Sequence, residues 1–172
     1  MGYCGGTTKD PDYQHIGDHA ETVEIDFDPE KITYAELLKQ YFSAAPCSHK
    51  SYSKQYASII FCANAEQRKI AETAKADLEK QRGTTVHAEI HDLDHFYMAE
   101  DYHQKYYLRH TAELMRDFQQ RFASQAEFRD STAVARANGY IGHFGDAKQL
   151  KEEIEKLGLS EAAQKWLLAH TR

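Results

Sequence analysis

The sequence lacks the features that mark several other classes of protein. It has only three cysteines, Cys4, Cys47 and Cys62, which do not have the spacing of metal ligands and whose odd number argues against a structural disulfide framework. No apolar run approaches the ~20 residues of a membrane helix, and no basic segment followed by an apolar one marks a secretory signal. Lys and Arg are scattered and the net charge is −6, which argues against nucleic-acid binding. These absences predict a cytoplasmic protein that binds neither membranes nor nucleic acids and keeps its cysteines as thiols unless one has a redox role.

The composition and the hydrophobic pattern indicate a folded α+β domain. Hydrophobic residues make up 41% and charged residues 28% of the chain, which is typical of a globular protein. The first twenty residues are rich in glycine and are predicted to form a loop. The predicted strands are 21–27, 56–62 and 85–91, and the two helices between them begin at the caps Thr33 and Asn64. This alternation predicts an α+β sandwich with helices on one face of a sheet.

From about residue 99 the pattern is helical to the end of the chain. One helix is predicted to begin at Asp146 and to close near Gly158. Another, capped by Ser160, contains Trp166. We expect these two helices to form a small hairpin that packs on the main body.

Glu21 is the first residue that could carry chemistry. If a strand begins there, Glu21 lies on the same face as Val23, Ile25 and Phe27, which should be the core face. Partial desolvation at the end of an apolar face favours the protonated acid, and such a group is a candidate general acid. The alternative is a frayed strand end with Glu21 in water.

Two tyrosines, Tyr3 and Tyr56, stand beside turns or strand starts. Each could donate a hydrogen bond to an oxygen-bearing substrate. The alternative for each is a half-buried packing residue.

Two further sets of side chains invite a chemical role. His87, Glu89 and His91 share one face of a predicted strand, which is a possible metal set, although the solvent face of a half-buried strand looks the same. Cys47 follows Pro46 in a short loop, where we expect an exposed thiol. Cys62 ends an apolar strand, so we expect it to be buried and inert.

Six segments, in order, resemble motifs of the peptide methionine sulfoxide reductase A family. The segments are 2–6 (G-Y-x-G-G), 11–13 (P-x-Y), 17–29 (G-H-x-E-x-V…D-P), 55–58 (T-Q-Y-R-S), 66–67 (the start of the following helix) and 99–106 (A-E-x-Y-H-Q-x-Y). A single match would be weak, whereas six in the right order identify the chain as a member of the family. The similarity covers residues 1–108, and residues 109–172 are then expected to form a helical C-terminal extension.

The resemblance implies a ferredoxin-like α/β sandwich and an enzyme that reduces methionine S-sulfoxide, free or in proteins, to methionine. In this family a cysteine thiolate attacks the sulfoxide sulfur, while a glutamic acid and two tyrosines hold and protonate its oxygen. By matching motifs, Glu21 is the implied acid, and Tyr3 and Tyr56 are the implied phenolic donors. His103 is an implied substrate-binding residue. The resemblance implies no cofactor, because thioredoxin, or dithiothreitol in vitro, supplies the electrons.

The sequence departs from the family's pattern in three ways. The G-C-F-W-G motif that carries the nucleophile is absent, so we expect a chain truncated before it, without the first strand and helix. Such a loss would leave a sheet edge uncovered and favour instability or self-association. Ser51 stands where the family often has an aspartate, and no cysteine follows Cys62. Cys47 is therefore the expected resolving cysteine.

Three functions remain open at this point, of which the metal-binding protein that would use His87, Glu89 and His91 is one. A second is a methionine-S-sulfoxide reductase whose nucleophile, cysteine or selenocysteine, lies outside the sequence. A selenocysteine codon read as a stop would place the start downstream of it, and a natural truncation or an alternative transcript start is equally compatible with the residues. Another is a catalytically inactive relative that binds methionine sulfoxide or a protein partner.

Overall fold

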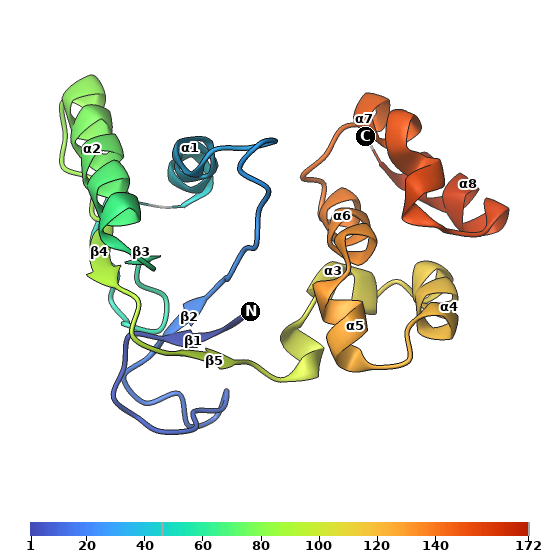
Figure 1. The fold of residues 1–172 in the computed structure, drawn as a ribbon, viewed down its shortest axis with the longest axis horizontal. Coiled ribbons are helices and arrows are strands. Elements are labelled where there is room, and N and C mark those ends of the chain that lie inside the picture. The colour runs from blue at the N-terminus through green and yellow to red at the C-terminus, as the bar shows by residue number, and fades with distance from the viewer. Residues whose placement is uncertain (46, 172) are drawn as a thin grey trace. The chain divides into compact units, whose positions relative to one another are not determined.

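A computed structural model describes residues 1–45 and 47–171. The chain forms two compact units, Met1–Ala99 and Glu100–Arg172 (Figure 1). Over the described residues, the first unit contains two small sheets and two longer helices, and the second is helical. This mixture confirms the predicted α+β class. Along the chain, the first unit ends at residue 99 and the second begins at residue 100. The predicted division into a family domain, 1–108, and a helical extension, 109–172, stays a prediction.

A three-stranded antiparallel sheet is built around the N-terminal strand. β1 (Gly2–Cys4) lies between β2 (Ala20–Thr22) and β5 (Phe96–Met98). The prediction of a loop over the first twenty residues is therefore wrong at β1, while residues 5–19 do form an irregular connection. This connection returns the chain to the sheet at the residue before Glu21.

The strand predicted over residues 21–27 is wrong beyond Thr22, where β2 ends. Val23 and Ile25 are 61% and 58% exposed, so the expected core face does not form there. The reason is pairing, because β1 is three residues long and supplies partners only for residues 20–22. Self-association stays a prediction, and these two apolar side chains next to an edge strand are where it would arise.

The second sheet belongs to a strand–helix–strand unit. β3 (Ile59–Cys62) and β4 (Glu89–Asp92) pair in parallel, and α2 (Ala65–Arg82) connects them. Parallel neighbours require a crossover of this kind, since a tight turn can join only antiparallel strands. Both strands begin later than predicted, which leaves Tyr56 in the turn before β3.

The two helices of the first unit begin where the sequence indicates. α1 (Tyr34–Ala44) has a capping box, in which Thr33 accepts from the Glu36 N–H and Glu36 accepts from the Thr33 N–H. In α2, Asn64 accepts from the Gln67 N–H at 2.9 Å, and the helix ends at Gly83 with a positive φ. These helices form a core with β3 and with the segment just before β4. Its buried residues are Leu38, Phe42, Cys47, Ile60, Cys62, Ala71, Val86 and Ala88.

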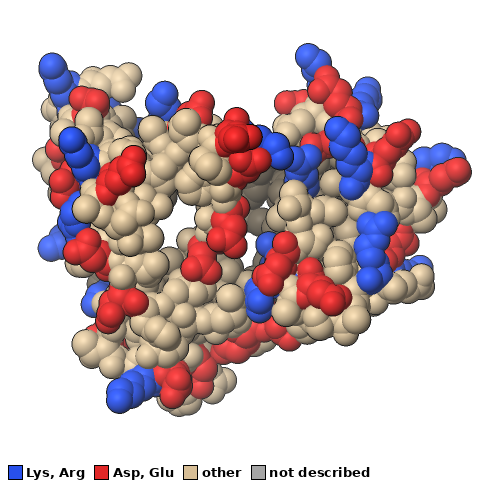
Figure 2. Space-filling model, in the orientation of Figure 1, with Lys and Arg blue, Asp and Glu red and all other residues tan. Residues whose placement is uncertain are grey.

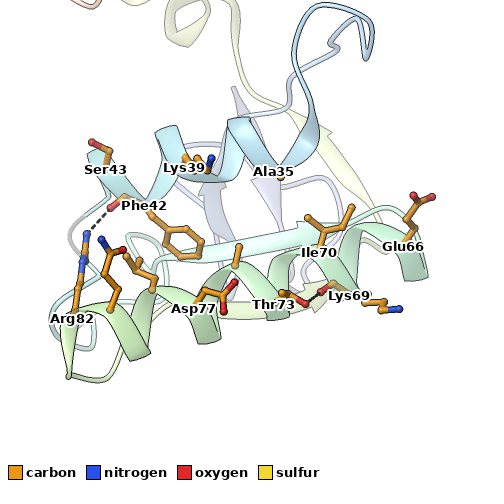
Figure 3. A pocket seen from close by; sticks show the side chains of 13 residues that line it. Ala35, Lys39, Phe42, Ser43, Glu66, Lys69, Ile70, Thr73, Asp77 and Arg82 are labelled. Atoms are coloured by element: carbon orange, nitrogen blue, oxygen red, sulfur yellow. Dashed lines mark hydrogen bonds between the residues drawn. The ribbon is translucent and has the colours of Figure 1, made fainter.

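A groove with a volume of about 730 Å³ runs between α1 and α2 (Figure 3). Phe42 and Ile70 point into it, and Arg82 donates to the Phe42 carbonyl at 3.4 Å at one end. Among the residues that the structure describes, those predicted to form the site do not line this groove. It is therefore separate from the predicted site.

The second unit is a set of short helices around one apolar core. Its elements are η1 (Asp101–His103), α3 (Tyr106–Arg109), α4 (Ala112–Arg121), α5 (Gln125–Asp130), α6 (Thr132–Ile141), α7 (Ala147–Glu153), η2 (Ile154–Leu157) and α8 (Glu161–His170). The predicted caps are confirmed, because Asp146 accepts from the Gln149 N–H and Ser160 from the Ala163 N–H. Gly158 closes η2 with a positive φ of 66°, as expected.

Among the described residues of the second unit, the carboxylate of Glu153 is buried. Glu153, 9% exposed, accepts a hydrogen bond from the Tyr140 hydroxyl at 2.5 Å and forms an ion pair with Arg136. A Cβ at Gly145 would lie 2.5 Å from the Tyr140 ring, so only glycine allows the ring this position. The network ties α6 to the end of α7.

The surface carries charges of both signs. On the face drawn in Figure 2, Lys and Arg are interspersed with Asp and Glu. In the described part of the chain, no helix is both long and apolar enough to cross a membrane.

Candidate active site

The predicted acid and one predicted phenol are neighbours on the antiparallel sheet. Glu21 of β2 pairs with Tyr3 of β1, and Tyr3 pairs with Tyr97 of β5. Directly paired residues on adjacent strands point to the same face of a sheet. The three side chains therefore form one row across the sheet, with Tyr3 in the middle.

The turn before β3 brings the second tyrosine to Glu21. The Glu21 N–H donates to the Gln55 carbonyl at 2.9 Å, and the Gln55 Nε2 donates to the Glu21 Oε1 at 2.7 Å. Tyr56 follows directly. The neighbouring Tyr13 phenol, ahead of partial desolvation and the Glu21 charge, raises the pKa of Tyr56. Tyr56 is therefore a protonated hydrogen-bond donor at neutral pH.

The two predicted phenols differ in their access to solvent. Tyr3 is 2% exposed, whereas Tyr56 is 62% exposed and Glu21 is half-buried. Tyr3 thus forms a covered part of the cluster beside Glu21. Tyr56 is the phenol that a ligand in solution can reach.

The connection between β1 and β2 is held by Asp18 and His19. The Asp18 carboxylate accepts from the backbone N–H of Thr7 at 2.7 Å and of Thr8 at 3.1 Å, and from both of their hydroxyls. His19, 1% exposed, accepts at Nδ1 from the Gly6 N–H, and its Nε2 lies 2.8 Å from the Thr8 carbonyl. A carbonyl only accepts, so the ring proton is on Nε2. These contacts fix the segment immediately before Glu21.

Asp18 leads to a prediction about pH. The backbone N–H of Thr7, followed by that of Thr8, lowers the pKa of Asp18 far below its usual range. The pKa of Asp18 is lower in the folded state than in the unfolded state. Its contribution to the stability of the folded state is therefore fully present above the unfolded pKa and is lost as pH falls through the folded pKa. We expect Asp18→Asn to speed amide hydrogen exchange at Thr7 and Thr8 at neutral pH. In the wild type, exchange at these two amides should exceed its intrinsic pH dependence only in strong acid, where Asp18 becomes protonated.

The matched control is Asp10→Asn, which changes an exposed aspartate of the same connection whose positive φ asparagine accepts readily. It should leave exchange at Thr7 and Thr8 unchanged. Equal exchange in Asp18→Asn and wild type would show that Asp18 does not hold the loop.

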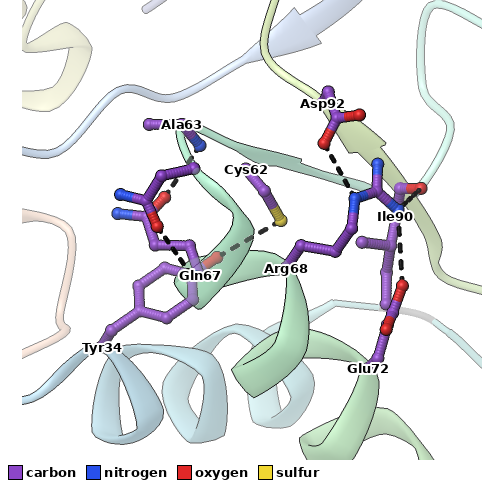
Figure 4. A network of polar contacts seen from close by, with 9 residues as sticks. Tyr34, Cys62, Ala63, Gln67, Arg68, Glu72, Ile90 and Asp92 are labelled. Atoms are coloured by element: carbon purple, nitrogen blue, oxygen red, sulfur yellow. Dashed lines mark hydrogen bonds and ion pairs between the residues drawn. The ribbon is translucent and has the colours of Figure 1, made fainter.

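All three cysteines are buried, each at most 1% exposed. The expectation of an exposed Cys47 is wrong, because its carbonyl accepts from the His87 N–H at 2.8 Å and its side chain joins the core of the first unit. The expectation of a buried Cys62 is confirmed. Its Sγ lies 3.9 Å from the Tyr34 hydroxyl (Figure 4), and burial raises the pKa of this thiol.

Cys4 is next to Tyr3 on β1 and therefore points to the opposite face of the sheet from Tyr3 and Glu21. Burial also raises the pKa of the Cys4 thiol. The thiolate is the nucleophilic form of cysteine. Neither Cys4 nor Cys62 is thus activated for attack on a substrate.

The structure places the possible metal set and Ser51 on the surface or near it, beside the turn before β3 and on or just before β4. His87, Glu89 and His91 are exposed, and His91 Nε2 lies 2.9 Å from Glu89 Oε2. Within residues 1–45 and 47–171, no three His, Cys, Asp or Glu side chains converge as metal ligands. Ser51 donates to the Ser53 carbonyl at 2.8 Å and lines a polar pocket of about 190 Å³.

His103 belongs to the second unit. It ends η1, its ring centroid lies 4.2 Å from that of Tyr102, and its Nε2 lies 3.8 Å from Glu100. Its substrate-binding role stays a prediction.

Sequence reasoning missed three members of the cluster around Glu21. Gln55 and Tyr13 stand inside segments that resemble family motifs, T-Q-Y-R-S and P-x-Y, so the sequence did carry a signal for them. Tyr97 lies in no such motif. It becomes visible only through the pairing of β5 with β1.

Comparison with known proteins supports a family assignment. The sequence profile described as peptide methionine sulfoxide reductase matches residues 1–135. The peptide methionine sulfoxide reductase of Drosophila melanogaster is 32% identical over 172 residues, 99% of this chain and 69% of that protein. MsrA 2 of Synechocystis sp. is 36% identical over 123 residues, 64% of this chain and 58% of that protein. The structure of methionine sulfoxide reductase A of Corynebacterium diphtheriae matches with a TM-score of 0.54 and 28% identity, over 63% of this chain and 61% of that chain.

The fold and the sequence together define an oxidoreductase family. The chain belongs to the peptide methionine sulfoxide reductase family, which confirms the resemblance found in its motifs. It spans 69% and 58% of the two relatives and 61% of the solved structure.

Proposed function

We propose that this chain supplies the sulfoxide-binding side of a peptide-methionine (S)-S-oxide reductase, which acts on methionine S-sulfoxide in proteins or as the free amino acid. The observation that carries the proposal is the cluster of a half-buried carboxyl group, Glu21, with the phenols of Tyr3 and Tyr56. A sulfoxide oxygen is a strong acceptor, and this cluster offers it an acid and an exposed phenol as donors. Membership of the family supports the same conclusion.

The proposed chemistry needs no metal or prosthetic group, because thiols carry both electrons. A thiolate or selenolate attacks the sulfoxide sulfur, the oxygen passes to this nucleophile, and methionine is released as the thioether. A second thiol then displaces water and forms a disulfide. Thioredoxin, or dithiothreitol in vitro, reduces the disulfide in a reducing compartment such as the cytoplasm.

In this proposal Glu21 donates a proton to the developing oxygen and Tyr56 hydrogen-bonds to it. The nucleophile comes from outside these 172 residues, because Cys4 faces away from Glu21 and all three thiols are buried. A resolving role for Cys47 requires that this buried residue becomes accessible.

The test is a pair of measurements on the 172-residue protein with peptides that contain one methionine sulfoxide epimer. Titration followed by NMR should show tighter binding of the S epimer than of the R epimer. Incubation with dithiothreitol, followed by mass spectrometry, should show no conversion to methionine. Equal affinity for both epimers would contradict the binding site, and product formation would mean that one of the three cysteines is the nucleophile.

A further inference from the structure

Three consecutive residues in the turn before β3, Lys54, Gln55 and Tyr56, lie at the cluster around Glu21. The Lys54 Nζ donates to the carbonyl of Gly5 at 3.0 Å, and Gly5 is the residue that follows the strand carrying Tyr3. Gln55 contacts Glu21, and Tyr56 is itself the exposed phenol. The Ala57 N–H donates to the Lys54 carbonyl at 3.1 Å, which closes the turn around Gln55 and Tyr56.

Gln55 is the member of this turn that touches the acid. It binds Glu21 twice, since its carbonyl accepts from the Glu21 N–H at 2.9 Å and its Nε2 donates to Glu21 Oε1 at 2.7 Å. The two residues are 34 positions apart in sequence. A backbone contact fixes where Glu21 lies, and a side-chain contact fixes how its carboxyl group is turned.

The side-chain contact distinguishes the two carboxyl oxygens. An amide nitrogen only donates, so Oε1 must act as an acceptor when it faces the Gln55 Nε2. When Glu21 is protonated, the proton then resides on Oε2. That oxygen is the one left to donate to a ligand.

A neutral hydrogen-bond donor suits the orientation of a protonated carboxyl group better than a charged donor. A lysine or arginine at position 55 would form an ion pair and favour the ionised carboxylate, which has no proton to give. A glutamate would repel the acid, and a methionine would fill the space without donating. Glutamine orients the carboxyl group without placing a charge beside it.

We infer that Gln55 is a positioning residue that places the acid proton of Glu21 on Oε2, the oxygen directed at a bound sulfoxide. The inference rests on the proposed function, because it assigns Gln55 a part in the same site. Gln55 acts only through Glu21 and does not itself touch the substrate.

The test is a double-mutant cycle on the whole 172-residue chain, with S-sulfoxide peptide affinity measured by NMR titration, which reaches millimolar dissociation constants. Gln55→Met keeps the length of the side chain and removes the donor. We expect it to weaken S-epimer binding about tenfold, the effect of one hydrogen bond. In a Glu21→Ala background the same substitution should change the affinity less than about twofold, because the residue it acts through is gone.

The matched control is Gln40→Met on the exposed face of α1, which should bind like the wild type. Equal losses from Gln55→Met with and without Glu21 would mean that Gln55 only supports the turn, which overturns the inference. Unchanged or tighter binding by Gln55→Met would also overturn it. A wild type that does not prefer the S epimer would instead refute the proposed function, and the inference with it.

Discussion

Glu21→Ala is expected to weaken the binding of a methionine-S-sulfoxide peptide by between about tenfold and a hundredfold. The proposed site offers the sulfoxide oxygen two donors, and Glu21 is the one held in place by a paired strand and by Gln55. Removing it costs a hydrogen bond and leaves Gln55 Nε2 without its acceptor. The measurement is the NMR titration with S-epimer and R-epimer peptides, in which the preference for S should fall together with the affinity.

Two further variants test whether the effect belongs to the Glu21 carboxyl group: one changes this residue conservatively, and the other is a control at a neighbouring carboxylate. Glu21→Gln keeps the side-chain length and can still offer an N–H to the sulfoxide, so it should lose less affinity than Glu21→Ala. Glu24→Ala removes an exposed carboxylate just beyond the end of β2 and should bind like the wild type. Wild-type affinity in Glu21→Ala would remove Glu21 from the site, whatever the family motif implies.

Features that depend on a few neighbouring residues could be predicted from the sequence. The caps at Thr33, Asn64 and Ser160 each need only a side chain and a backbone N–H three residues later, and all three form. Gly83 and Gly158 end helices with positive φ, for which glycine is the least strained residue. The same local logic located α1, α2 and the pair α7 and α8.

Features that depend on distant partners could not be predicted from the residues themselves. The apolar alternation of residues 21–27 is typical of a strand, but a strand also needs a neighbour, and β1 pairs with only three residues. Cys47 stands in a loop, yet a hydrogen bond to the His87 N–H, 40 residues away, draws it into the core. For the same reason no sequence pattern placed Gln55 on Glu21.

The candidate site combines residues that the sequence motifs predicted with an arrangement that only the fold reveals. Motif resemblance named Glu21, Tyr3 and Tyr56, and strand register then placed the first two side by side. The resemblance gave no information on solvent exposure, which differs sharply between the side chains of Tyr3 and Tyr56. In the proposed site, we therefore expect the exposed phenol of Tyr56, rather than that of Tyr3, to contact a ligand first.

Glu153→Ala is expected to lower the free energy of unfolding of the second unit by about 3 kcal/mol. Glu153 accepts from the buried Tyr140 hydroxyl, which would be left without that acceptor. The ion pair with Arg136 contributes less, because the Arg136 side chain is 45% exposed and screened by solvent. The measurement is urea unfolding followed by the fluorescence of Trp166, the only tryptophan in the sequence, which lies in α8 of this unit.

The matched control for this variant is Glu152→Ala, which makes the same chemical change at an exposed residue of the same helix. The change in helix propensity is equal in the two variants and cancels, so Glu152→Ala should shift stability by less than about 0.5 kcal/mol. Tyr140→Phe removes the donor and leaves Glu153 paired with Arg136, and it should therefore cost only about 1 kcal/mol. If Glu153→Ala and Glu152→Ala unfold at the same urea concentration, the buried carboxylate contributes nothing to stability, and α6 and α7 are held together by apolar packing alone.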